Sequence, residues 1–262
     1  TAMVNIAKTT MEELSAALEE EGVQARPHPW LANCLILSKT GSLERLSTFR
    51  DGLFYIQDPA SRLAVLALDP KPGMKALDCC AAPGGKSFAA AIRMEGTGEV
   101  ISCDLHPHKK KLIQAGADRL GLKNITPMTA DGKAFRPEWE NVFDRVLVDA
   151  PCSGLGVIRK KPDIRYKDPE TLTDLPRVQR AILDNAARYV KPGGVLVYST
   201  CTLLRRENEE VALGFLSDHP AFKADGFPLP KYAGDARTGM LTLWPHRQGT
   251  DGFFICKLRK EE

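Results

Sequence analysis

Several signatures of metal and disulfide proteins are missing from this 262-residue sequence. It contains no Cys-x-x-Cys pair, and of its five histidines only His106 and His108 lie close together. That pair lacks the ligand spacing of a zinc site, so we expect no bound metal and interpret the pair as part of a solvated loop. The seven cysteines are an odd number, and Cys79 and Cys80 are adjacent. This is a poor disulfide framework and indicates a reducing compartment.

Long apolar runs are also missing. No run approaches the ~20 residues needed to span a bilayer, and Thr1–Asn5 lack the basic and apolar regions of a signal peptide. We therefore expect a cytoplasmic protein without membrane contact. The chain begins with Thr1, so we expect a fragment or a processed product. The hydrophobic share of 43% and the charged share of 26% are those of an ordinary globular protein.

Charge and periodicity divide the chain in two. Residues 1–70 hold 6 Lys or Arg and 9 Asp or Glu, whereas the whole chain carries +3, so the excess of positive charge lies in residues 71–262. Residues 1–70 are predicted to form a small α+β module, bounded by the turn Lys71-Pro72-Gly73. Its expected strands are 3–8 and 33–38. Its expected helices are one after the capping box of Thr10 and Glu13, a short one capped by Ser42, and one at 59–68.

In residues 71–262 the pattern of strands and helices alternates. The predicted strands are 74–80, 99–103, 125–129, 143–150 and 194–200. The predicted helices begin near residues 87, 107, 174 and 207. This alternation indicates an α/β fold with a mostly parallel sheet covered on both faces. Segments 241–244 and 253–258 are expected to add an antiparallel hairpin at one edge of the sheet.

Aspartates end four successive predicted strands: Asp78, Asp104, Asp131 and Asp149. Aspartates often begin turns, so one alone would be weak evidence, but four such placements favour an acidic rim at the ligand edge of the sheet. Asp104 is placed to bind both hydroxyls of a ribose, and Asp131 to face an adenine amino group. The loop Ala81–Lys86 matches neither G-x-G-x-x-G nor a P-loop. A nucleoside that carries a cation rather than phosphates fits this rim, and S-adenosylmethionine is such a ligand.

Three motifs together resemble those of the RNA (cytosine-5) methyltransferases, in particular the branch of bacterial ribosomal RNA small subunit methyltransferase B (Sun/Fmu). They are Asp78–Lys86, Asp149–Gly154 and Ser199–Thr202, supported by Gln57–Ser61 and Lys161–Arg165. The resemblance covers nearly the whole chain. It implies a Rossmann-like class I methyltransferase domain behind a small N-terminal module. The helical RNA-binding domain of the antitermination-factor type that this branch carries at its N-terminus is not among the 262 residues.

Cofactor contacts are expected at the acidic rim and the glycine loop. The residues assigned to S-adenosylmethionine are Asp78, Cys80, Ala81, Ala82, Pro83, Gly84, Gly85, Lys86, Asp104, Asp131 and Asp149.

Two thiols at strand ends suit chemistry on cytosine C5, which becomes nucleophilic when a thiolate adds to C6. Spacing alone leaves open whether Cys152 or Cys201 attacks. The resemblance implies that Cys201 attacks C6 and that Cys152 helps to release the product. It also implies that Asp149 contacts the ring near N3, with Lys86 close enough to lower a thiol pKa. The other cysteines, Cys34, Cys79, Cys80, Cys103 and Cys256, are interpreted mainly as small buried hydrophobic residues.

A basic segment follows Cys152. Its residues Arg159, Lys160, Lys161 and Arg165 are predicted to contact RNA phosphates, the alternative being a solvated charged loop. The predicted function is therefore that of a monomeric enzyme that methylates cytosine C5 in small-subunit ribosomal RNA. Two alternatives remain open at this point: a tRNA substrate, and a non-catalytic ribosome-assembly factor that binds RNA.

Overall fold

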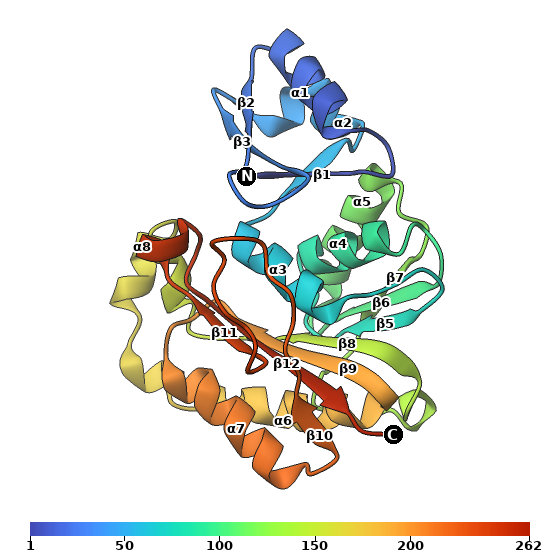
Figure 1. Cartoon of the computed structure of the whole chain (residues 1–262), viewed down its shortest axis with the longest axis vertical. Coiled ribbons are helices and arrows are strands. Elements are labelled where there is room, and N and C mark those ends of the chain that lie inside the picture. Colours follow the sequence, from blue (N-terminus) through green and yellow to red (C-terminus); the bar gives the residue numbers. More distant parts are fainter.

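The computed structural model places the chain in a small sheet module and a larger α/β domain (Figure 1). It describes residues 1–262, except for the side chains of residues 169 and 171. None of the helices in this described part is long and apolar enough to cross a membrane.

The N-terminal module is an antiparallel sheet of order β2-β3-β1-β4 with helices packed on it. Its strands are β1 (Ala2–Val4), β2 (Gln24–Pro27), β3 (Cys34–Ser38) and β4 (Phe54–Ile56), and its helices are α1 (Met11–Glu20), η1 (Leu43–Arg45) and α2 (Ser47–Arg50). The predicted capping box is confirmed, because Thr10 Oγ1 accepts from Glu13 N at 3.2 Å and Glu13 Oε2 accepts from Thr10 N at 2.9 Å. The predicted Ser42 cap is wrong, since its hydroxyl bonds the Glu44 carboxylate instead.

Polar contacts fix the module against the larger domain. Asn5 Nδ2 donates to the carbonyl oxygens of Gly52 and Leu120, both at 2.9 Å. The Arg119 guanidinium lies 3.9 Å from the centre of the Phe49 ring. Since Arg119 and Leu120 end helix α5 (Pro107–Leu120), these contacts join the module to that helix.

Helix α3 (Pro59–Leu68) belongs with the larger domain. Asp58 caps it by accepting from Ala60 N at 3.0 Å, and its buried face shares one hydrophobic core with Val195 and Ile255 of the large sheet. The expected boundary at residues 70 and 71 stays a prediction. We propose to move it ahead of α3, because this helix buries its apolar side on the large sheet.

The large sheet has the order β10-β12-β9-β8-β5-β6-β7, and β11 also pairs with β12. Its parallel strands are β5 (Lys75–Asp78), β6 (Glu99–Asp104), β7 (Ile125–Thr129), β8 (Phe143–Asp149) and β9 (Val190–Thr200), and its antiparallel strands are β10 (Phe222–Ala224), β11 (Met240–Leu243) and β12 (Phe253–Lys260). The predicted mostly parallel sheet with an antiparallel C-terminal hairpin is confirmed. The short strands β2, β4 and β10 were not predicted.

Helices cover both faces of this sheet (Figure 1). They are α4 (Gly85–Arg93), α5 (Pro107–Leu120), α6 (Leu175–Tyr189), α7 (Glu209–Asp218) and α8 (Pro245–Gln248), with the short turns η2 (Pro137–Trp139), η3 (Leu155–Val157), η4 (Pro162–Tyr166), η5 (Pro169–Leu172) and η6 (Arg205–Glu207). Alternate residues of β9 reach opposite cores: Val195 and Val197 pack with α3 and α4, while Leu196 and Tyr198 pack with α6 and α7. The strand order reverses at β5, between β8 and β6, which is where such sheets bind ligands.

Candidate active site

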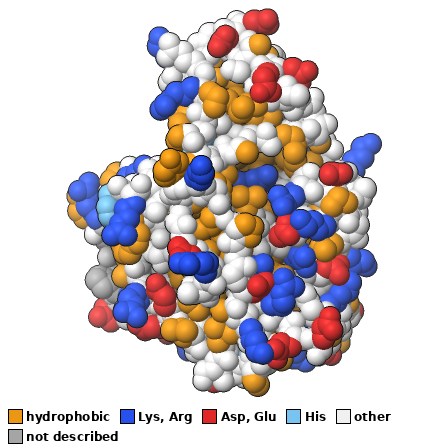
Figure 2. Space-filling view, in the orientation of Figure 1, with side chains coloured by type: hydrophobic (Ala, Val, Ile, Leu, Met, Phe, Trp, Pro, Cys, Tyr) orange, Lys and Arg blue, Asp and Glu red, His pale blue; other side chains and the backbone are white. Residues whose placement is uncertain are grey.

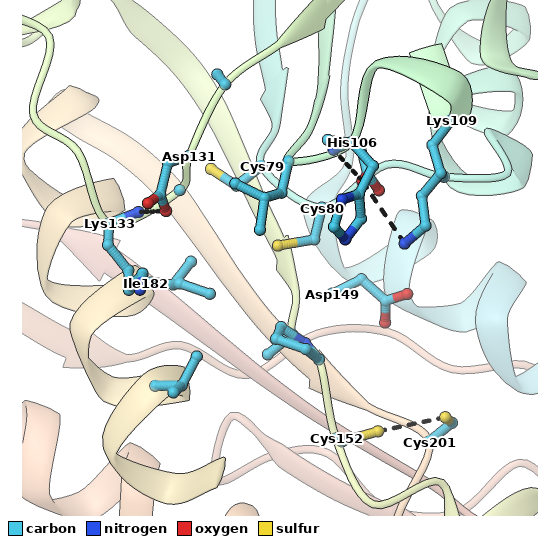
Figure 3. A pocket seen from close by; sticks show the side chains of 18 residues that line it. Cys79, Cys80, His106, Lys109, Asp131, Lys133, Asp149, Cys152, Ile182 and Cys201 are labelled. Atoms are coloured by element: carbon cyan, nitrogen blue, oxygen red, sulfur yellow. Dashed lines mark hydrogen bonds and ion pairs between the residues drawn. The ribbon is translucent and has the colours of Figure 1, made fainter. Parts of the chain in front are cut away.

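A cavity of about 390 Å³ opens beyond the carboxyl ends of β5 to β9 (Figure 3). Its size falls in the range of small-molecule sites. Seven predicted site residues line it: Cys80, Ala82, Asp104, Asp131, Asp149, Cys152 and Cys201. The rest of its lining is Cys79, Leu105, His106, Lys109, Ala130, Gly132, Lys133, Ala150, Pro151, Val178 and Ile182. In Figure 3 Asp131 and the two facing sulfur atoms lie at opposite ends of the view.

Asp104 and Asp131 form the acidic end of the cavity. Asp104 Oδ1 accepts from His106 N at 3.2 Å and lies 3.6 Å from the Lys109 ammonium. Asp131 Oδ1 accepts from Lys133 N at 2.9 Å. Each carboxylate thus holds its own turn and also borders the cavity, so the turn interpretation and the ligand interpretation are compatible.

The glycine loop supports the cavity more than it lines it. Of the loop residues assigned to the cofactor, Ala81, Pro83, Gly84, Gly85 and Lys86 are not among the cavity-lining residues that the structure describes. Gly84 has φ +116°, and a Cβ there would lie 2.3 Å from the Phe88 ring. Close packing on helix α4 therefore requires this glycine.

Asp78 is also set back from the cavity. It is buried, and its carboxylate accepts from Ser87 Oγ at 2.8 Å. Burial raises the pKa of Asp78 to about 7, because a charged carboxylate loses its hydration there. A role for Asp78 in shaping the loop fits these contacts better than direct contact with a ligand.

The thiol end joins the two motifs that the sequence separates by 49 residues. The sulfur atoms of Cys152 and Cys201 lie 3.3 Å apart. Beside them, the Lys86 ammonium donates to Asp149 Oδ2 at 2.5 Å, and Ser199 Oγ donates to Asp149 Oδ1 at 2.8 Å. The parallel pairing of β8 and β9 produces this meeting, because it sets Asp149 opposite Ser199.

The environment differs between the two sulfur atoms. The hydrogen bond with Cys152 and the nearby Lys86 charge hold the pKa of Cys201 below its ordinary value, against the opposing effect of burial. The same hydrogen bond and burial raise the pKa of Cys152 well above the ordinary range. The Lys86 charge acts on Cys201 and therefore favours the thiolate form at this member of the pair.

Comparison with known proteins agrees with the motifs. Residues 65–259 match the family model described as 16S rRNA methyltransferase RsmB/F. The chain belongs to this family. It is 45% identical over 268 residues to a probable ribosomal RNA small subunit methyltransferase B of Bacillus subtilis, covering 100% of this chain and 60% of that protein.

Two further comparisons are consistent with this assignment. Ribosomal RNA small subunit methyltransferase F of Salmonella agona is 35% identical over 269 residues, covering 98% of this chain and 56% of that protein. A solved methyltransferase homolog protein from Pyrococcus horikoshii superposes with a TM-score of 0.83 at 30% identity, covering 99% of this chain and 85% of that one. The chain thus spans 56–60% of the length of the two curated relatives.

The seven cysteines, which all lie in the described part of this RsmB/F family chain, are free. Cys34, Cys79, Cys103 and Cys256 are buried, as expected of small hydrophobic residues. Cys80 is half-buried and lines the cavity. Its place fits its assignment to the cofactor site and not the interpretation as a core residue.

The basic segment does not offer all its charges to a ligand. Lys160 Nζ lies 2.6 Å from Asp58 and 2.8 Å from Asp251. Arg159 lies 3.8 Å and 3.5 Å from the same two carboxylates. Lysine and arginine side chains are also interspersed with acidic ones over the face drawn in Figure 2. Phosphate contact by Arg159, Lys160, Lys161 and Arg165 stays a prediction, and the first two already have carboxylate partners.

Several site residues were not predicted. Val178 and Ile182 of α6 were interpreted as one side of a helix, yet they border the cavity. Leu105 and His106 follow Asp104 and border it too, a position that their adjacency to the strand end could have indicated. Glu207, Asn208 and Gln179 belong to no motif that the sequence revealed. They are buried and form hydrogen bonds with the loops that carry Cys152 and Cys201.

Proposed function

We propose that this chain transfers a methyl group from S-adenosylmethionine to C5 of a cytosine in 16S ribosomal RNA, through a covalent bond between Cys201 and C6. The observation that carries the proposal is the thiol pair, with sulfur atoms 3.3 Å apart at the edge of a nucleoside-sized cavity. Family membership supports the reaction class. The named activities of the relatives in Bacillus subtilis and Salmonella agona support the choice of small-subunit RNA.

The cavity fits the proposed cofactor. Asp104 and Asp131 provide carboxylates for ribose hydroxyls and an amino group, and Leu105, Val178 and Ile182 provide apolar surface for a flat base. The acidic end also suits a cationic ligand better than one with phosphates. When bound, S-adenosylmethionine supplies a methyl group on a positively charged sulfur.

The chain's own groups would carry out the remaining steps. The Cys201 thiolate forms a bond to C6, which pushes electron density to C5, and the Asp149–Lys86 pair balances the charge that develops near N3. Methyl transfer to C5 would leave the donor sulfur as a neutral thioether. Solvent water or hydroxide then takes the C5 proton, and the Cys201–C6 bond breaks, which restores the aromatic ring and returns Cys201 as a thiolate. The Cys152 thiol lies close enough to assist this release.

The RNA would enter from the face of Cys152 and Cys201, with its target base unpaired or flipped out of a helix. We propose that Lys161 and Arg165 contact its phosphates. Ribosomal RNA as substrate implies a cytoplasmic location, where free thiols persist. A monomer would suffice for this site, because one chain supplies the acidic end, the thiol pair and the basic segment.

A methyl-transfer assay tests the proposal. The 262-residue chain is incubated with a methyl donor labelled with tritium and with 16S ribosomal RNA, small subunits or tRNA. Label at C5 of a cytosine in 16S RNA supports the proposal. Label in tRNA alone would overturn the choice of substrate, and RNA binding without label would favour an assembly factor.

A further inference from the structure

Two buried residues, Glu207 and Asn208, lie directly behind the two thiol loops. After β9 the chain turns through Cys201–Leu204 and doubles back in η6, so that Glu207 returns to the end of its own strand. Tyr198 Oη fixes this return by donating to the Glu207 carbonyl at 2.5 Å.

Glu207 holds the loop of Cys152 together with Gln179 of helix α6. Its Oε2 accepts from Ser153 N at 2.9 Å and from Gln179 Nε2, also at 2.9 Å. The same Gln179 nitrogen donates to the Pro151 carbonyl at 3.0 Å. The residues immediately before and after Cys152 are therefore both held by this pair of side chains.

Asn208 does the same for Cys201. Its Oδ1 accepts from Thr200 Oγ1 at 2.5 Å, and its Nδ2 donates to the Thr202 carbonyl at 3.1 Å. The two loops are also tied to each other, because the hydroxyls of Ser153 and Thr202 lie 2.7 Å apart. Together with Gln179, this dipeptide contacts the residues on both sides of each cysteine, through the Pro151, Ser153 and Thr202 backbone and the Thr200 hydroxyl.

We propose that Glu207 and Asn208 are positioning residues that set the contact between the Cys152 and Cys201 sulfur atoms. A need for packing alone does not explain Glu207. The hydrogen bonds to its side chain come from neutral N–H groups, and a buried carboxylate costs stability relative to an apolar side chain of similar size. An apolar side chain could not accept hydrogen bonds from the Ser153 N–H and the Gln179 amide.

This inference rests on the proposed function, because that function requires the Cys152 and Cys201 sulfur atoms to be in contact. Its test needs neither RNA nor methyl donor. The rate of alkylation of Cys201 by iodoacetamide is measured against pH by mass spectrometry in the intact chain. The variants are Glu207→Ala, Glu207→Gln, which keeps an acceptor for Ser153 N–H, and Asn208→Ala.

In Glu207→Ala and Asn208→Ala the hydrogen bond from Cys152 should be lost. Alkylation of Cys201 at pH 7 should then slow about tenfold, as a rise of about 1 in the pKa of this thiol requires. Glu207→Gln should retain most of the original profile. Glu21→Ala is the matched control. Its carboxylate also accepts a backbone N–H, that of Ser47 at the start of α2 at 2.5 Å, but this contact lies in the N-terminal module, so the variant should leave the profile unchanged.

Unfolding temperatures are measured for every variant. If Glu207→Ala fails to fold, Glu207→Gln and Gln179→Met carry the test, with Gln179→Met expected to slow alkylation. An unchanged Cys201 profile in all folded variants would overturn the proposal. So would an equal shift in Glu21→Ala, because the effect would then follow stability and not position. Normal profiles in a chain that methylates no RNA would count against the proposed function instead.

Discussion

The loops after β8 and β9 are alike in their place in the fold and differ in chemical environment. Each follows a buried parallel strand, and each places one cysteine at the same cavity. Yet the pKa of Cys201 lies below its ordinary value, because of its hydrogen bond with Cys152 and the nearby Lys86 charge, whereas that hydrogen bond and burial raise the pKa of Cys152. Two cysteines 3.3 Å apart can therefore take different roles. The proposed choice of Cys201 as the nucleophile therefore rests on the neighbours of each thiol and not on its motif alone.

The largest effect is expected from removing the thiolate. Cys201→Ala should lower methyl transfer by about 10⁴-fold or more, since an enzyme that loses its nucleophile retains little beyond binding. It should also abolish covalent protein–RNA adducts, which are measured on denaturing gels after incubation with 16S RNA.

Cys256→Ala is the control for this variant, because Cys256 is a free, buried cysteine of β12 that is not among the described residues lining the cavity. It should still form adducts. Adducts that persist in Cys201→Ala would mean that Cys152, and not Cys201, attacks C6.

The second largest effect is expected for Cys152→Ala, which distinguishes product release from nucleophilic attack on C6. Cys152→Ala should lower turnover by about 10²-fold, the lower range for loss of proton transfer by a side chain. Its adduct should accumulate and not disappear, because Cys201 can still bond to C6. Gel-shift bands and released product are followed over time in the same reaction. A variant that accumulates no adduct while its turnover falls would assign Cys152 to an earlier step.

Local sequence signals predicted most of the fold. Helix α5 and strand β7 have the predicted bounds, because Pro107 begins the helix, Gly121 ends it, and 125–129 is a compact strand. The strands β2 and β10 were missed for a physical reason. Both are short edge strands with mostly exposed, polar residues, so they lack the alternation that marks a half-buried strand.

The site was predictable only in part. The four aspartates were recognisable because parallel strands end at one edge, but the sequence could not separate Asp104, Asp131 and Asp149, which line the cavity, from Asp78, which is buried behind it. The burial of the Asp78 carboxylate depends on how α4, which carries its partner Ser87, packs on the sheet. The partners of Arg159 and Lys160 were hidden for a similar reason, since Asp58 and Asp251 lie about 100 residues away in both directions along the chain.

The smallest effect should come from the cation beside the thiol pair. Lys86→Met removes a positive charge that lowers the pKa of Cys201 and leaves the Asp149 carboxylate, which raises it. The pH profile of Cys201 alkylation should therefore move to higher pH by about 1, a typical change for loss of one nearby charge. The double variant Lys86→Met with Asp149→Asn removes both charges and should move the profile back toward that of the unmodified chain. A single variant with an unchanged profile would mean that the Cys152 hydrogen bond alone distinguishes the two loops.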